Sequence, residues 1–200
     1  MRVVRALLVA VGAALLLVFV VEAAGARRFE FSSSTFRLTF ARIRFESNLN
    51  PIVNCALTME GSLHSTTIAK VAGTLVGYIT RARLGPCETG RATILSESLP
   101  WHVRYGAFTG TLPTINRVEL QVVSMHIRLL TFETPCLQQT TAEQPLRVYL
   151  LREAGGAISE VEAEARRLQS DCGLDFDEII ARGGGVTVLN ASTRVTVRLI

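Results

Sequence analysis

Hydrophobic and polar positions alternate along most of the chain beyond residue 27, a pattern typical of strands that bury one face. At the start of this region Phe36, Leu38 and Phe40 alternate with arginine and threonine. The period of two recurs between turn residues at 53–59, 71–79, 101–105 and 118–129. The pattern predicts an all-β fold for residues 27–200, either a single antiparallel β-sandwich or a partly closed barrel.

The alternation changes phase at two places inside these predicted strands. After Phe40 the apolar positions shift by one residue and continue at Ile43 and Phe45. A second change of phase separates Val122 from Val123. An extra residue in one strand of a pair produces such a slip, so both places are predicted to be β-bulges that bend the sheet.

Two predicted strands carry features that locate the core. Gly73 and Gly77 stand among large aliphatic residues on one face of segment 66–80, which indicates that another layer of the fold approaches closely there. Trp101, the only tryptophan, shares a face with Tyr105, opposite the polar side of its strand. We expect that aromatic face to be buried.

The chain is expected to end in a β-hairpin. Residues 186–189 and 194–200 alternate, and the polar residues 190–192 between them predict a turn. The glycine run 183–185 precedes the hairpin, and no Lys-Ser or Lys-Thr follows it as in a phosphate-binding loop. We therefore interpret this run as a flexible turn that leads into the hairpin.

Segment 158–169 fits two kinds of secondary structure. Ser159 and Glu162 form a capping box, and apolar residues follow at helical spacing. The glutamates between 160 and 164 nevertheless alternate with small apolar residues, as they would in a strand. Local propensity favours a helix and the neighbouring segments favour a strand, so the residues alone leave both alternatives open.

Met1–Ala26 is predicted to be a signal peptide. Two arginines precede an uninterrupted apolar run over residues 6–21. As a helix this run spans about 24 Å, less than a hydrocarbon core of about 30 Å. Residues 24–26 then supply the small-x-small pattern of a cleavage site. If it is not cleaved, the segment anchors residues 27–200, a single exported domain, in the membrane.

The cysteines predict disulfide bonds in this exported domain. All four, Cys55, Cys87, Cys136 and Cys172, follow the predicted signal. An even count in an oxidising compartment indicates two disulfides, and buried free thiols are the alternative. Three pairings are possible. We expect Cys55–Cys87 and Cys136–Cys172, because partners 32 and 36 residues apart close the shortest loops at the lowest entropic cost.

The amount and distribution of charge in the sequence narrow the classes of partner that the protein is expected to bind. The formal net charge is only +4, and Lys70 is the only lysine among the 21 basic residues, a bias typical of a GC-rich bacterial genome. The arginines are scattered singly along predicted strands rather than clustered, which argues against a nucleic-acid partner. A cell-surface or extracellular partner fits export. Contact with a membrane is expected only if the N-terminal segment is uncleaved.

The histidines His64, His102 and His126 are the candidate metal ligands. They lack the short spacing of a zinc-binding pair. Arginines follow His102 and His126 at two residues' distance, and a neighbouring cation disfavours a bound one. We expect solvated imidazoles, with no metal and no cofactor.

Other polar groups do not define a catalytic site. The acidic residues Asp171, Asp175, Asp177 and Glu178 lack the ligand ladder of a calcium loop and are expected to be solvated. Ser62 lies close to His64, but no G-x-S-x-G motif surrounds it. No catalytic residue is assigned.

Several segments resemble uncharacterised secreted β-rich proteins of GC-rich soil actinobacteria. The similar segments are 61–64, 68–80, 99–105, 106–113 and 195–200. The resemblance covers most of the chain after the signal and implies export and a β-rich fold, with no known activity. In the similar sequences the region matching 158–170 is more strand-like, which favours the strand here.

These observations predict a secreted or cell-envelope module that binds a partner or has a structural role, and that is not an enzyme. The alternative is a secreted hydrolase whose site is assembled from residues distant in sequence. A pocket of convergent polar groups with shifted pKa values would favour the hydrolase. A filled core with only surface grooves would favour the module.

Overall fold

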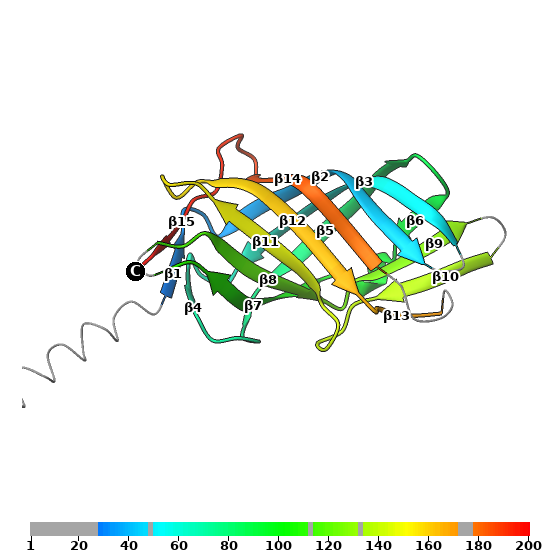
Figure 1. The fold of residues 1–200 in the computed structure, drawn as a ribbon, viewed down its shortest axis with the longest axis horizontal. Helices are drawn as coiled ribbons and strands as arrows, with labels where there is room; N and C mark the ends of the chain where they lie inside the picture. Colours follow the sequence, from blue (N-terminus) through cyan, green and yellow to red (C-terminus); the bar gives the residue numbers. More distant parts are fainter. Residues whose placement is uncertain (1–27, 48–49, 112–113, 132–133, 172–177) are drawn as a thin grey trace, which may run out of the picture.

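The computed structural model describes residues 28–47, 50–111, 114–131, 134–171 and 178–200 and is all-β over them, apart from a 3₁₀ turn. Eight antiparallel strands close into a barrel in the order β11-β12-β14-β2-β3-β5-β7-β8, with β8 paired to β11 (Figure 1). The predicted fold class is confirmed, and the barrel is closed rather than partly closed. Its strands are β2 (Thr35–Ser47), β3 (Asn50–Leu63), β5 (Leu75–Cys87), β7 (Trp101–Thr109), β8 (Arg117–Val123), β11 (Leu146–Arg152), β12 (Ile158–Arg166) and β14 (Glu178–Val188).

A smaller sheet lies at each end of the barrel (Figure 1). One has the order β15-β1-β4, formed by β1 (Arg28–Phe31), β4 (Thr67–Ala69) and β15 (Val197–Leu199). The other has the order β13-β10-β9-β6, formed by β6 (Arg91–Ile94), β9 (His126–Thr131), β10 (Thr134–Gln139) and β13 (Gln169–Ser170). The 3₁₀ turn (Ser96–Ser98) connects β6 to β7. Because β1 pairs with β15, the first described strand and the C-terminus lie side by side.

The apolar face of each barrel strand points inward. Phe40 pairs with Leu57 across β2 and β3, and both side chains are almost fully buried. Trp101 is completely buried, as predicted, and its indole N–H donates a hydrogen bond of 2.9 Å to Ser98 Oγ beside the 3₁₀ turn. Burying each such side chain contributes about 1.5–3 kcal/mol, and closing the sheet leaves the barrel without a free edge.

One of the two predicted β-bulges is present. The register of β2 against β3 shifts between Phe40 and Ile43, where Ala41 is exposed. The prediction at Val122 and Val123 is wrong, because the change of phase there marks the end of β8. Ser124 then adopts a φ of 66°, which turns the chain out of the barrel toward β9.

The predicted strand over 66–80 is two strands. A turn separates β4 from β5, and Gly73 lies in it with a φ of 79° and open space where a Cβ would be. At Gly77 a Cβ would lie 2.3 Å from the carbonyl oxygen of Ser62, so the predicted close approach is present. It comes from β3, the paired neighbour of β5 in the same sheet, and not from another layer as predicted. The alternating pattern alone does not tell whether a glycine lies in a turn, as Gly73 does, or in close contact with a neighbouring strand, as Gly77 does.

The glycine run 183–185 is not a turn, which corrects its interpretation. All three residues lie inside β14. A Cβ on Gly184 would come within 2.4 Å of the Phe40 ring, so the absence of a side chain lets Phe40 fill the barrel.

Only the turn and the first pairings of the predicted C-terminal hairpin are present. Asn190 has a φ of 65° in the predicted turn, and the Val188 amide donates to the Thr193 carbonyl at 2.8 Å. Beyond the bridge between Thr187 and Arg194 the chain leaves β14, and β15 pairs with β1 instead. The prediction of a complete hairpin is therefore wrong in its second strand.

Segment 158–170 is strand, as favoured above. It forms β12 and β13, and β12 pairs with β11 on one side and β14 on the other. Val161 and Ala163 point into the barrel while the glutamates point out. Pairing on both edges and burial of the small apolar face outweigh the local helix propensity.

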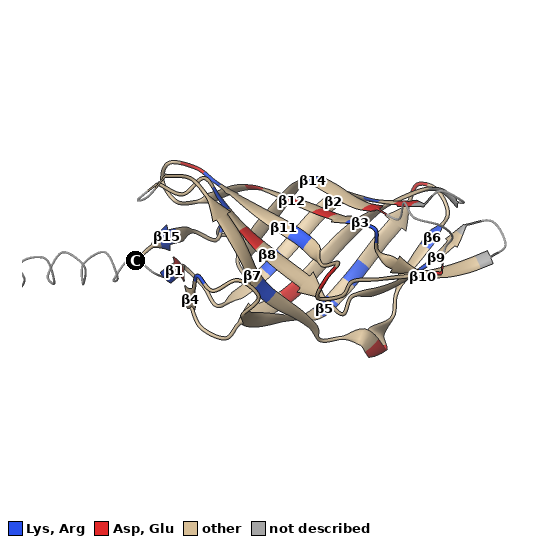
Figure 2. Cartoon of the chain, turned by 60° about the horizontal axis from the view of Figure 1, so that its bottom comes forward, with Lys and Arg blue, Asp and Glu red and all other residues tan. Residues whose placement is uncertain are grey.

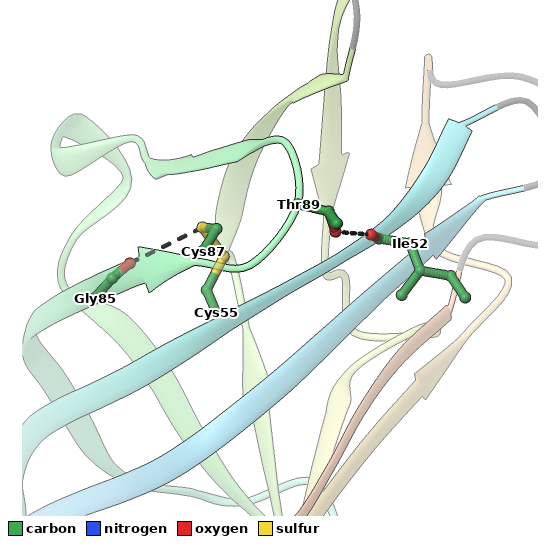
Figure 3. Close-up of a disulfide and its surroundings, with 5 residues drawn as sticks. All are labelled: Ile52, Cys55, Gly85, Cys87 and Thr89. Carbon is green, nitrogen blue, oxygen red and sulfur yellow. Dashed lines mark hydrogen bonds between the residues drawn. A yellow bond between two sulfur atoms is a disulfide. The ribbon is translucent and has the colours of Figure 1, made fainter.

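Cys55 and Cys87 are joined by a disulfide, as predicted, which links β3 to the end of β5 (Figure 3). Cys136 is also disulfide-bonded, but Cys172 lies outside the described residues, so the second pairing stays a prediction. A disulfide is consistent with an extracellular location.

The predicted signal peptide, residues 1–26, lies outside the described residues as well. No helix in the described part of the chain is long and apolar enough to cross a membrane.

Candidate functional site

A cavity of about 40 Å³ lies inside the barrel, toward the end that carries the β15-β1-β4 sheet. Each of the eight barrel strands contributes at least one side chain to its lining. Phe31 of β1, Ser33 and Val195 complete the wall at this end. Large buried side chains such as Ile43 and Phe45 occupy the opposite half of the barrel.

Among the described residues that line the cavity, Ser33 alone has a polar side chain, and its hydroxyl group is already engaged. It donates to the Thr35 carbonyl oxygen at 2.9 Å and accepts from the Thr35 amide at 3.1 Å. A water molecule inside would need two or more polar partners, so a cavity of this kind stays dry. An apolar group is the occupant that its chemistry favours.

The size of the cavity limits what can enter. Its volume exceeds the 10–15 Å³ or so needed for one water molecule, but it is well below the roughly 150 Å³ of a cavity that binds benzene. Pockets for drug-sized ligands are several times larger still, about 300–1,000 Å³. The cavity therefore has room for a short alkyl group and not for a large ring system.

Strand β1 closes the barrel end beside the cavity. Phe29 is fully buried, and its ring centroid lies 5.9 Å from that of Tyr105 and 5.6 Å from that of Phe108. The Lys70 ammonium group covers the Phe29 ring at 5.6 Å from the centroid. With β4 on one edge and β15 on the other, β1 has hydrogen-bonded neighbours on both sides.

The tyrosines with shifted pKa values do not line this cavity. Burial, together with the negative charge of Glu119, raises the pKa of Tyr105. Burial also raises the pKa of Tyr149, whose hydroxyl group donates to Glu164 Oε1 at 2.8 Å. The Arg117 guanidinium covers the Tyr149 ring at 4.4 Å.

The predicted candidate ligands are dispersed. His64 and His102 lie on either side of Tyr78, with ring centroids 5.1 and 5.4 Å from that of the tyrosine. His126 belongs to β9 in a different sheet. Across the described ranges, no three His, Cys, Asp or Glu side chains come together in a way that could hold a metal ion.

The remaining predicted groups are also separated. Ser62 lies near the end of β3, in register with Tyr78. Asp171 is exposed and accepts a hydrogen bond from the Leu137 amide, whereas Glu178 begins β14 and pairs with Arg166 at 3.6 Å. Asp175 and Asp177 lie outside the described residues.

Charged residues of both signs are distributed along the barrel strands, as the coloured positions in Figure 2 show. Many form cross-strand pairs; for example, Glu60 accepts from Arg37 at 2.8 Å and lies 3.7 Å from Arg81. Exposed pairs of this kind contribute at most about 1 kcal/mol each. They balance the surface charge more than they stabilise the barrel.

Sequence patterns identify the lining side chains as buried but not the cavity between them. Alternation places Leu38 and Val103, for example, on inward faces. A gap in packing depends on the summed volumes of side chains from all eight strands, and no local pattern contains that sum.

No protein-family model, curated protein or solved structure matches this chain.

Proposed function

We propose that this protein is an exported, non-enzymatic binding module that holds the end of a short aliphatic chain in its barrel cavity. The observation that carries the proposal is the apolar lining, which comes from all eight strands and in which no described polar side chain is free. The chemistry of the cavity thus selects an apolar ligand.

Eight-stranded barrels have an interior just wide enough either to be filled by side chains or to hold one small ligand. In this barrel one half of the interior is filled by side chains, and the other half contains the cavity. An alkyl group in that space would regain dispersion contacts that the lining atoms now lack. Each methylene group transferred from water contributes about 0.8 kcal/mol.

The non-enzymatic part of the proposal is supported by the positions of the reactive groups. A hydrolase needs a nucleophile, a base and an orienting group within hydrogen-bond reach of one another. In the described residues His64 is exposed in the bend after β3, His102 and His126 are half-buried on strands of different sheets, and the cavity lining is apolar. Export is supported by the Cys55–Cys87 disulfide together with the predicted signal peptide.

The proposal is tested by titrating the purified domain with linear alcohols from 1-butanol to 1-octanol and recording methyl NMR spectra. We expect saturable shifts confined to methyl groups of lining residues such as Val103, Val148 and Val186. The Val148→Ile variant adds one methylene group to the cavity and should weaken the binding several-fold.

Val118→Ile is the matched control, because Val118 is a fully buried barrel valine that does not line the cavity. It should bind the alcohols as the wild type does. Shifts spread over surface methyl groups, or equal weakening by both variants, would contradict binding in the cavity.

A further inference from the structure

A second candidate site lies on the outer face of the barrel, in a groove of about 440 Å³ between β2, β3, β14 and the segment after β5. Its polar lining consists of Arg42, Arg44, Arg182, Asn54 and Thr89. No residue of this groove lines the apolar cavity, so the inference is independent of the proposed function.

Two neighbouring bulges bring the arginines together. In β2 the register shift between Phe40 and Ile43 places Arg42 on the outer face, where it is exposed. In β14 the register against β12 shifts next to Ala181, and Arg182 is the exposed residue that follows. Ala181 pairs with Ile43, so the two bulges are adjacent. Bulges commonly re-aim side chains at functional sites.

The groove has more hydrogen-bond donors than acceptors. Arg42 is paired with Glu88, and Arg44 Nη2 lies 2.8 Å from Glu46 Oε2. The Arg44 Nε–H is buried and has no acceptor in the described part of the chain. Within the same ranges, Arg182 has no carboxylate partner. An anion in the groove would bring acceptors to the exposed guanidinium groups of Arg42 and Arg182.

The side of the groove formed by β3 and the segment after β5 is held in place by covalent and hydrogen bonds. The Thr89 hydroxyl group donates to the Ile52 carbonyl oxygen, which ties the segment after β5 to β3 (Figure 3). The Cys55–Cys87 disulfide joins the same two parts of the chain beside it. Asn54 therefore presents its amide from a restrained strand, a form of preorganisation that lowers the entropic cost of binding.

We propose that this groove binds a dianionic phosphate group, as in inorganic phosphate or a phosphate monoester. The planar fork of a guanidinium group matches two phosphate oxygens at once, and three such forks line one groove. Glu46 and Glu88 balance two of the arginines, which leaves Arg182 as the uncompensated cation. A phosphodiester has two free oxygens where a phosphate monoester has three, so it should engage fewer guanidinium forks and bind more weakly.

The test measures binding of inorganic phosphate to the purified domain at low salt by amide NMR titration. Arg182→Gln removes one exposed fork and should weaken the affinity by about tenfold. Arg28→Gln is the matched control, because Arg28 is an exposed arginine on β1, outside the groove. It should change the affinity less than about twofold. Thermal unfolding of both variants verifies that the fold is retained.

Dimethyl phosphate and acetate distinguish a phosphate site from general attraction of anions. We expect inorganic phosphate to bind more tightly than either probe, with amide shifts near Asn54, Thr89 and Arg182. The inference is overturned if no saturable shift occurs, if acetate binds as tightly as phosphate, or if Arg28→Gln weakens binding as much as Arg182→Gln.

Discussion

Gln138 lies on β10 in register with Ile127, and its side chain is completely buried. Neither its amide nitrogen nor its amide oxygen has a hydrogen-bond partner among the described residues. A buried amide that gives up its hydration without a partner costs free energy, so Gln138 works against the stability of the fold.

Replacing Gln138 by methionine keeps the length of the side chain and removes both unpaired atoms. We expect the free energy of unfolding to rise by about 1–3 kcal/mol in urea denaturation. The neighbouring Gln139→Met, at a half-buried position, should stay within about 0.5 kcal/mol of the wild type. A loss of stability in Gln138→Met would mean that the amide is satisfied, for instance by an ordered water molecule.

Tyr149 makes stability depend on pH in the alkaline range. Burial, the hydrogen bond to Glu164 and nearby negative charge raise its pKa above the ordinary 10.0. The unfolded chain then loses this proton at a lower pH than the folded protein does. The stabilisation that Tyr149 gives the folded protein is therefore complete below about pH 10, and it is lost as the pH rises through the pKa of Tyr149 in the folded state.

The Tyr149→Phe variant removes this titration. Between pH 8 and pH 11 the wild type should lose more unfolding free energy than the variant does, measured by denaturant unfolding at each pH. Tyr105, whose pKa is also raised, accounts for part of the loss that both proteins share. Parallel losses in the two proteins would show that Tyr149 is not the group responsible.

At the scale of the elements, alternation predicts the strands but not their partners. The alternation in β12 assigns its residues to the correct faces of a strand, but the pairing of β12 to β11 and β14 is what decides between strand and helix. The sequence pattern places the last strand in a hairpin with β14, yet this strand pairs with β1, which is more than 160 residues away in the chain. Pairing between distant segments leaves no local signature, because only the total packing selects it.

The glycine run in β14 shows the same limit and supports a test. An alanine at Gly184 would place its Cβ 2.4 Å from the Phe40 ring and 2.9 Å from the Val161 carbonyl oxygen. Gly184→Ala should therefore lower the unfolding free energy by about 1–3 kcal/mol through overpacking. At Gly155 no atom of the described residues lies within 4 Å of the position that a Cβ would take, so Gly155→Ala should be neutral or slightly stabilising. Equal effects of the two variants in chemical denaturation would refute the contact.

For the whole molecule, the pairing of strands distant in sequence is what creates both candidate sites, and closure of the barrel encloses the cavity. The all-β class and the Cys55–Cys87 disulfide could be predicted from the sequence, because alternation and loop length are local quantities. The cavity and the arginine groove could not. They depend on which strands become neighbours and on where bulges such as those at Arg42 and Arg182 come to lie next to each other.

The central claim is that the closed barrel keeps a dry apolar cavity able to receive an apolar group. The most direct measurement is a crystal structure of the domain under xenon pressure, because xenon enters apolar cavities without needing hydrogen bonds. We predict one xenon peak between Val103, Val148 and Val186, which is lost in Val148→Ile. Ordered water at that position, or side chains that close the space, would contradict the claim.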